Sequence, residues 1–328
     1  MTHLLKGIVW SPQEDRLRTP ARLICQLSIT IACAFAGVLG SGVFLSYGRD
    51  HGLLAGVNKQ TFDQIGNIVV APVAATLIYL SLKIGARMIE RRDFSIYGAT
   101  LSSTWMKQFS LGFALAAALM TFIFVTEYVA GWIQVEGYFG VTQAGYVLPV
   151  SLLYSLVKVV IVGICEELIF RGLILRNFVE SLTGLGGMGS RSSKTLALLL
   201  SAFLFGAVHL TNPNSGPAST VGIFVIGILF GLGYLGTNRL AIPIGLHMAW
   251  NLFQGVVYGF PVSGDKEPAC FLLTRQTGSE LFTGGTFGPE AGLMGMAAAV
   301  LGILVLLLYF QSEQNTGGGG PRLAVASH

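Results

Sequence analysis

Long apolar stretches alternate with short polar connections along almost the whole chain. Eight of these stretches have about the 20 residues that a helix needs to cross the hydrocarbon core of a membrane. They are residues 23–47, 66–86, 109–132, 147–170, 195–211, 218–236, 240–259 and 292–310. Within lipid every backbone polar group must be bonded inside the protein, and a single helix achieves this. The pattern therefore predicts an all-α, polytopic integral membrane bundle of about eight transmembrane helices.

The composition agrees with a membrane location. Hydrophobic residues make up 52% of the 328 residues and charged residues only 11%, whereas soluble domains carry about 25% charged residues. The net charge of +4 is spread over the connections, so it provides no basic patch for a nucleic acid. The four cysteines have none of the spacings of a zinc or redox motif. The expected surroundings are a lipid bilayer, and no nucleic-acid partner is expected.

Basic residues distinguish the two sides of this bundle. With the N-terminus inside, the inner segments hold fifteen Lys and Arg residues, and the outer segments hold four. Because cytoplasmic loops carry an excess of Lys and Arg, this count supports eight spans. It predicts a multi-pass protein of the cell membrane with both termini in the cytoplasm.

The same pattern divides the chain into six parts, and no internal repeat of the kind found in inverted-repeat transporters is present. They are a cytoplasmic segment (1–22), a three-helix membrane region (23–146), a core (147–260), an extracytoplasmic loop (261–291), a final helix (292–311) and a flexible tail (312–328). Residues 88–107 mix basic and aromatic side chains, which suits either a segment in the inner membrane interface or a solvated loop.

Three charged residues lie in the middle of the fourth apolar stretch. Placing a charge at the centre of a bilayer costs about 2.5–3.5 kcal/mol or more, so Glu166, Glu167 and Arg171 each need a partner or a role. Glu167 precedes Arg171 by four residues, the favourable arrangement for an ion pair on one helix face. Glu166 lies about 100° around the helix and remains free to act as a base. A single structural ion network near the membrane surface is the alternative.

Two further apolar stretches carry polar residues that fit the same chemistry. His209 follows Phe205 by four residues, and Asn251 follows His247 by four. Glu166 and His209 would orient and deprotonate a water, and the other two polar side chains would stabilise the oxyanion that forms. Alternatively, Glu166 and the two histidines would hold a zinc ion with water in the open position. The sequence leaves both chemistries open, although the helical motif H-E-x-x-H is absent.

Three short motifs carry a family resemblance. EELIFRG resembles the E-E-x-x-x-R motif of the CAAX protease and bacteriocin-processing (CPBP, formerly abortive-infection) family of intramembrane proteases. FGAVH resembles the F-x-x-x-H motif of that family, and HMAWN resembles its H-x-x-x-N motif. All three occur in the order of the family within residues 147–260, about a third of the chain. The chain is thereby identified as similar to the type II CAAX prenyl endopeptidases.

The resemblance implies an eight-helix fold with a cavity between helices. It also implies hydrolysis of peptide bonds in membrane-associated protein or peptide substrates. Carried over residue by residue, it makes Glu166 the base and His209 the partner that positions the water. His247 and Asn251 become the donors to the oxyanion.

The resemblance gives Glu167, Arg171 and Phe205 supporting roles. A mechanism without a metal is favoured, because only two histidines are available and Asn251 is a poor zinc ligand. Zinc held by Glu166, His209 and His247 stays open. Two functions without proteolysis compete with this interpretation: a transporter or proton relay, and an immunity or scaffold protein on the same fold.

One geometric requirement follows from the span boundaries. Glu166 falls toward the inner side of its span, whereas His209 falls toward the outer end of its own. The two side chains meet only if the fourth helix continues inward past Arg171, to about Glu180, or if the fifth begins before the bilayer. The first of these is favoured, because residues 170–182 are compatible with a helix.

Overall fold

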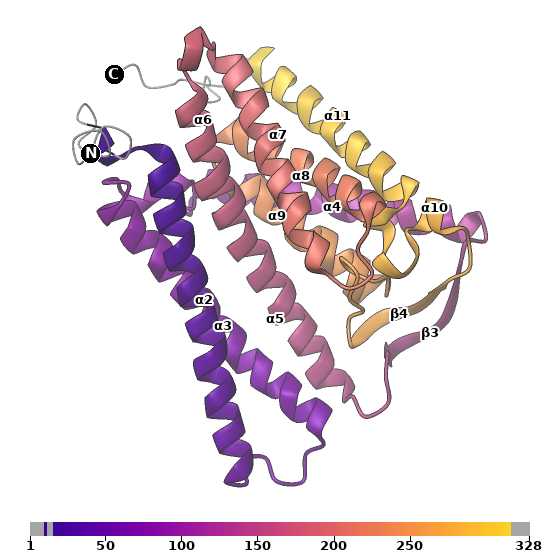
Figure 1. The fold of residues 1–328 in the computed structure, drawn as a ribbon. Coiled ribbons are helices and arrows are strands. Elements are labelled where there is room, and N and C mark those ends of the chain that lie inside the picture. Colours follow the sequence, from indigo (N-terminus) through magenta and orange to yellow (C-terminus); the bar gives the residue numbers. More distant parts are fainter. Residues whose placement is uncertain (1–9, 12–15, 316–328) are drawn as a thin grey trace.

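The computed structural model describes residues 10–11 and 16–315, and helices dominate it (Figure 1). The tail from 316 onward, most of the predicted flexible segment 312–328, lies outside the described residues, as do 1–9 and 12–15. The long helices are α2 (Thr19–Asp50), α3 (Lys59–Met88), α4 (Ser103–Val129), α5 (Leu148–Glu167), α7 (Ser190–Val208), α8 (Pro217–Thr237), α9 (Ala241–Asn251) and α11 (Leu293–Asn315). Shorter elements are β1 (Trp10–Ser11), β2 (Arg16–Leu17), β3 (Ile133–Val141), α6 (Arg176–Leu182), β4 (Ala269–Gln276) and α10 (Glu280–Thr283).

Seven helices of the described chain are long and apolar enough to cross a membrane. The remaining expected span, 240–259, is α9 followed by the π-helical turn η5 (Leu252–Val257). It falls short of a full span and is largely buried among other helices, including α4, α5 and α8. The prediction of an all-α polytopic membrane bundle is confirmed, with seven of the eight spans at full membrane length.

The fourth apolar stretch forms one continuous helix of 35 residues, from Leu148 to Leu182. It consists of α5, a π-helical segment η2 (Leu168–Leu175) and α6. The predicted continuation past Arg171 to Glu180 is therefore confirmed. α7 then runs back from Ser190, so that its end at His209 reaches the level of Glu166. Figure 1 shows α6 and α7 side by side in this hairpin.

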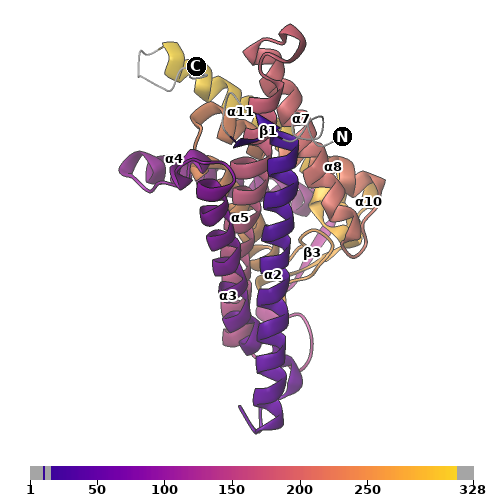
Figure 2. The same cartoon turned by 60° about the vertical axis from the view of Figure 1, so that its left-hand side comes forward.

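α4, α5 and α8 pack around α9, which carries His247 and Asn251. α2 and α3 pair along one side, and α3 packs on α5 (Figure 2). α4 crosses α9 at very short range, where Gly245 faces the backbone of Phe109 and Gly112 faces the backbone of Ile242. α8 packs against α7 and α9, and α11 covers α8 and α4. Because α9 is enclosed in this way, its polar side chains are held inside the bundle.

One end of the bundle is fastened by a buried ion network. Arg16 and Arg22 pair with both Glu90, after α3, and Glu180, on α6. This network joins the start of α2 to the ends of α3 and α6. Nearby, Tyr97 is fully buried, whereas most of the segment 88–107 around it is exposed or half-buried. The choice between an interfacial segment and a solvated loop stays a prediction.

The opposite end holds a two-stranded antiparallel ribbon that the sequence analysis did not predict. β3 and β4 pair along their length, with a bulge between Val135 and Gly137. Between η5 and β4, residues 261–268 cross the end of the bundle, and we call this segment the strap. The strap and β4 both come from the predicted loop 261–291.

Candidate active site

The charged motif of the fourth helix is centred on a buried ion pair. Nη1 of Arg171 donates to Oε1 of Glu167 over 2.7 Å, and both side chains are almost completely buried. The second arm of the guanidinium donates to the carbonyl of Gly227 on α8 over 3.2 Å. The i,i+4 pair expected from the sequence therefore forms, and it also links α5 and η2 to α8.

Aromatic rings enclose the guanidinium of Arg171. Its central carbon lies 4.3 Å from the ring centroid of Phe205 and 5.3 Å from that of Phe230. A cation held over desolvated aromatic faces gains roughly 2 kcal/mol. Phe205, the first residue of the F-x-x-x-H motif, thus contacts the guanidinium of Arg171. Phe230 makes a similar contact. The sequence did not indicate this contact, because Phe230 is one apolar residue among many in a glycine-rich helix.

His247 is held by the same carboxylate. Its Nδ1 lies 2.8 Å from Oε1 of Glu167, and its ring lies 5.1 Å from that of Phe230. Because an ionised carboxylate only accepts hydrogen bonds, Nδ1 carries a hydrogen and donates a hydrogen bond to Glu167. This contact turns the other nitrogen, Nε2, toward Glu166.

Glu166 differs from its neighbour Glu167 in its surroundings. Its side chain is 31% exposed, and its Oε2 lies 3.9 Å from Nε2 of His247. That distance is too long for a hydrogen bond, and Oε2 has no hydrogen-bond partner within the described part of the chain. Among the described residues no Arg or Lys pairs with Glu166, whereas Glu167 is paired with Arg171.

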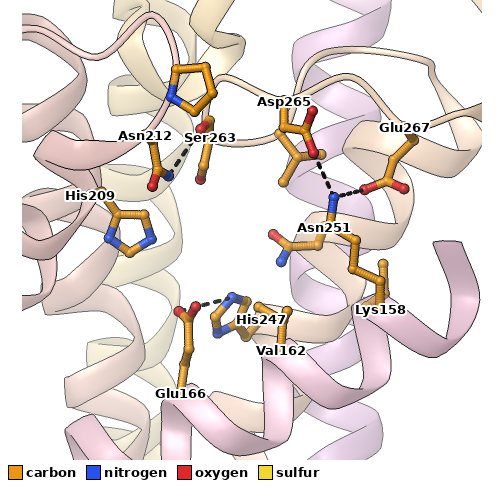
Figure 3. Close-up of a pocket in the computed structure, with 13 residues that line it drawn as sticks. Lys158, Val162, Glu166, His209, Asn212, His247, Asn251, Ser263, Asp265 and Glu267 are labelled. Carbon is orange, nitrogen blue, oxygen red and sulfur yellow. Dashed lines mark hydrogen bonds and ion pairs between the residues drawn. The ribbon is translucent and has the colours of Figure 1, made fainter. Parts of the chain in front are cut away.

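Glu166 faces a cavity of about 440 Å³ that His209, His247 and Asn251 also line. Figure 3 shows the side chains of these residues directed toward a common space, from α5, from the end of α7 and from α9. The structure therefore brings together the four residues to which the sequence assigned catalysis.

The ring of His209 has a defined orientation. Its Nδ1 lies 2.6 Å from the carbonyl oxygen of Phe205, one turn earlier, and its ring lies 4.8 Å from the Phe205 ring. A carbonyl only accepts, so Nδ1 is the donor. In the neutral ring Nε2 then keeps its lone pair, which is able to accept a hydrogen bond from a water.

The placement of the side chains bears on the alternative of a bound zinc ion. Glu166, His209 and His247 line one cavity. However, in residues 10–11 and 16–315 no three His, Cys, Asp or Glu side chains are grouped closely enough to hold a metal ion. The three proposed ligands do not fit a preformed zinc site as they stand.

The cavity has a charged wall that the sequence analysis did not assign to the site. Nζ of Lys158, two turns before Glu166 on α5, lies 2.9 Å from Oδ2 of Asp265 and 3.0 Å from Oε1 of Glu267. Both carboxylates belong to the strap and line the cavity (Figure 3). A lysine inside an apolar stretch was the available signal, but its partners are more than 100 residues away in sequence.

Further hydrogen bonds fix the strap over the cavity. Nδ2 of Asn212 donates to the carbonyl of Ser263 over 3.0 Å. The backbone N–H and the hydroxyl of Ser263 both donate to the buried carboxylate of Glu290. Burial raises the pKa of Glu290 to about 7, although the hydrogen bonds from Ser263 act in the opposite direction.

Comparison with known proteins gives one match, which covers the sequence range of this site. Residues 148–253, about a third of the chain, match the family model described as "Type II CAAX prenyl endopeptidase Rce1-like". No curated protein and no solved structure matches the chain. The matched range lies within the predicted core 147–260 and contains all three motifs, so the family recognised from those motifs is confirmed. Residues 148–253 of this integral membrane protein thus match the model of the Rce1-like type II CAAX prenyl endopeptidases, a family of proteases.

Proposed function

We propose that the chain is an intramembrane endopeptidase that hydrolyses peptide bonds of membrane-associated substrates with a water activated by Glu166. One observation carries this proposal. Within residues 10–11 and 16–315 no Arg or Lys pairs with the Glu166 carboxylate, which lies 3.9 Å from Nε2 of His247 in a cavity that His209 and Asn251 also line. The match of residues 148–253 to a protease family supports peptide-bond hydrolysis as the type of reaction.

The proposed reaction begins with a water bound between Glu166 and His209. Glu166 takes a proton from this water, and the oxygen of the water attacks the carbonyl carbon of the substrate peptide bond. The Nε2 lone pair of His209 accepts the second hydrogen of the water and thereby orients the attack. Glu166 then returns its proton to the leaving nitrogen as the carbon–nitrogen bond breaks.

The oxyanion of the tetrahedral intermediate would be stabilised by Nδ2 of Asn251 and Nε2 of His247. His247 already donates from Nδ1 to Glu167, so Nε2 donates as well only when the ring is an imidazolium. The carboxylates of Glu166 and Glu167 lie on either side of the ring.

A purified-protein assay tests the proposal. A membrane reporter with a cleavable linker is incubated with the wild type, Glu166→Ala and Glu166→Gln, and with Glu136→Gln on the exposed strand β3 as the matched control. Loss of the base should lower the rate by roughly 10²–10⁴-fold in both Glu166 variants, while the control cleaves normally. Cleavage at the wild-type rate by both Glu166 variants would contradict the catalytic assignment.

The same assay separates the alternative functions. A strong chelator should leave the rate unchanged on the metal-free mechanism, and loss of cleavage that added zinc restores would favour the zinc version. A transporter, proton relay or immunity protein on the same fold would cleave no reporter at all. The set of polar side chains gathered in one cavity favours the enzyme, because buried polar groups without a role are costly.

A further inference from the structure

The two ends of the bundle carry very different numbers of basic residues. One end, which we call the terminal end, holds the start of α2, the end of α3, the connection between α6 and α7, and the end of α11. Its described basic residues are Arg16, Arg18, Arg22, Lys83, Arg87, Arg91, Arg92, Lys107, Arg176, Arg191, Lys194 and Arg239. The opposite end, which we call the strap end, holds Arg49, Lys59, Lys266 and Arg275, with Lys158 just inside it.

The structure removes one residue from the inner side of the charge count. Arg171 is one of the fifteen basic residues assigned there from the sequence, but it is buried at the centre of the bundle. Removing it still leaves the terminal end with about three times as many basic residues as the strap end. Such an excess marks the cytoplasmic side of a membrane protein.

The catalytic cavity is open toward the strap end. Its outer wall consists of Asn212 and Pro213, in the connection after α7, and of the strap. Asp265 on the strap is 63% exposed, so this wall reaches solvent. The terminal end contributes no lining residue to the cavity.

The depth of the site agrees with this direction. The 19 residues of α7 place His209 about 28 Å from the start of the helix at Ser190. A hydrocarbon core is about 30 Å thick, so His209 lies near the boundary remote from the terminal end. A peptide that approaches from the strap end meets the cavity directly, whereas one from the terminal end must pass the buried Arg171 pair.

From these observations we infer that the enzyme takes its substrates from the extracytoplasmic face of the membrane. The substrate class is then an unfolded, membrane-proximal segment of a secreted or membrane protein, and not the cytosolic C-terminal tail of a lipid-anchored protein. This inference rests on the proposed function for its cleavage step. The sidedness of the cavity stands on the charges and the geometry alone.

Cysteine labelling tests the sidedness in intact bacterial cells that express the full chain. Cys25 and Cys33 on α2 are replaced by alanine, and the buried Cys165 and Cys270 are kept. Into this background are introduced Lys266→Cys on the strap and, as the matched probe, Ser192→Cys at the start of α7, both at exposed positions. A membrane-impermeant maleimide should label the strap variant in intact cells and the α7 variant only after the membrane is opened. The reverse pattern would overturn the inference.

Two single-span reporters test the cleavage side. Both carry the same cleavable linker, one on the outer and one on the cytoplasmic side of the membrane. We expect cells to cleave only the outer reporter, and purified protein in detergent to cleave both. Cleavage of the cytoplasmic reporter in cells would overturn this inference. Failure to cleave either reporter in detergent would instead overturn the proposed function, and the labelling result would still decide the sidedness.

Discussion

Glu167 and His247 are joined through one carboxylate oxygen, with Nδ1 of the histidine 2.8 Å from Oε1 of the glutamate. The same oxygen accepts from Nη1 of Arg171 over 2.7 Å. Glu167 therefore fixes the orientation of the ring whose other nitrogen faces Glu166. It touches no reacting atom in the proposed mechanism, so we regard it as a positioning residue.

Replacing Glu167 tests that positioning role. Glu167→Gln keeps the shape of the side chain, but its neutral amide holds Arg171 and His247 less strongly. A hydrogen bond to a charged group contributes about 1.5–3 kcal/mol, so kcat should fall roughly 10- to 100-fold with little change in KM. Reporter cleavage at several substrate concentrations measures the two constants. A rise in KM with an unchanged kcat would show that Glu167 acts on binding instead.

The role of Asn251 is testable by truncation. Its side chain lines the cavity, and removal of one oxyanion donor lowers kcat by about 10²–10³-fold in comparable enzymes. Asn251→Ala should show a loss of this size without loss of folded protein in detergent. Asn212→Ala is the matched control, because Asn212 lines the same cavity but donates to the strap. A fully active Asn251→Ala would remove it from the mechanism.

The candidate site was predictable because its signals are local in sequence. Glu167 and Arg171 lie one helical turn apart, and so do the partners in the other two motifs. Charge inside an apolar stretch made each motif conspicuous. The need to bring Glu166 and His209 to one level also predicted that the helix continues to about Glu180, and it ends at Leu182.

The surroundings of the site were not predictable, because they depend on contacts between distant parts of the chain. Lys158 meets Asp265 only after the eight intervening elements have packed. The ribbon pairs β3 with β4, and both strands lie in segments that the sequence predicted only as connections between helices. Tyr97 lies in a stretch of mixed polarity, and its burial results from the packing of η1 (Phe94–Tyr97) against η2.

The close crossing of α4 and α9 predicts a strong effect at Gly245. A Cβ atom there would lie 2.3 Å from the carbonyl oxygen of Phe109 and 2.9 Å from the backbone nitrogen of Phe113. Backbone atoms of a packed helix do not yield easily, so Gly245→Ala should push α9 away and displace His247. Overpacking of this kind costs about 1–3 kcal/mol. Both the melting temperature and kcat should fall.

Gly40→Ala is the control for this substitution, because its Cβ would meet nothing within 4 Å. Alanine is the better helix former, so this variant should match or exceed the wild-type melting temperature. Equal behaviour of the two variants would show that the α4–α9 crossing does not hold the site.

The anchor of the strap predicts a pH dependence of stability. Burial raises the pKa of Glu290 from its ordinary value near 4.5 to about 7, so the folded protein binds this proton more tightly than the unfolded chain. The resulting stability is fully present below about pH 4.5 and is lost as the pH rises through about 7. The loss is on the order of 3 kcal/mol.

Glu290→Gln has no proton to lose, so its melting temperature in detergent should change less with pH between about pH 5 and 8 than that of the wild type. Glu280→Gln on the exposed helix α10 should keep the wild-type slope, and an unchanged slope in Glu290→Gln would assign the pH dependence to another group.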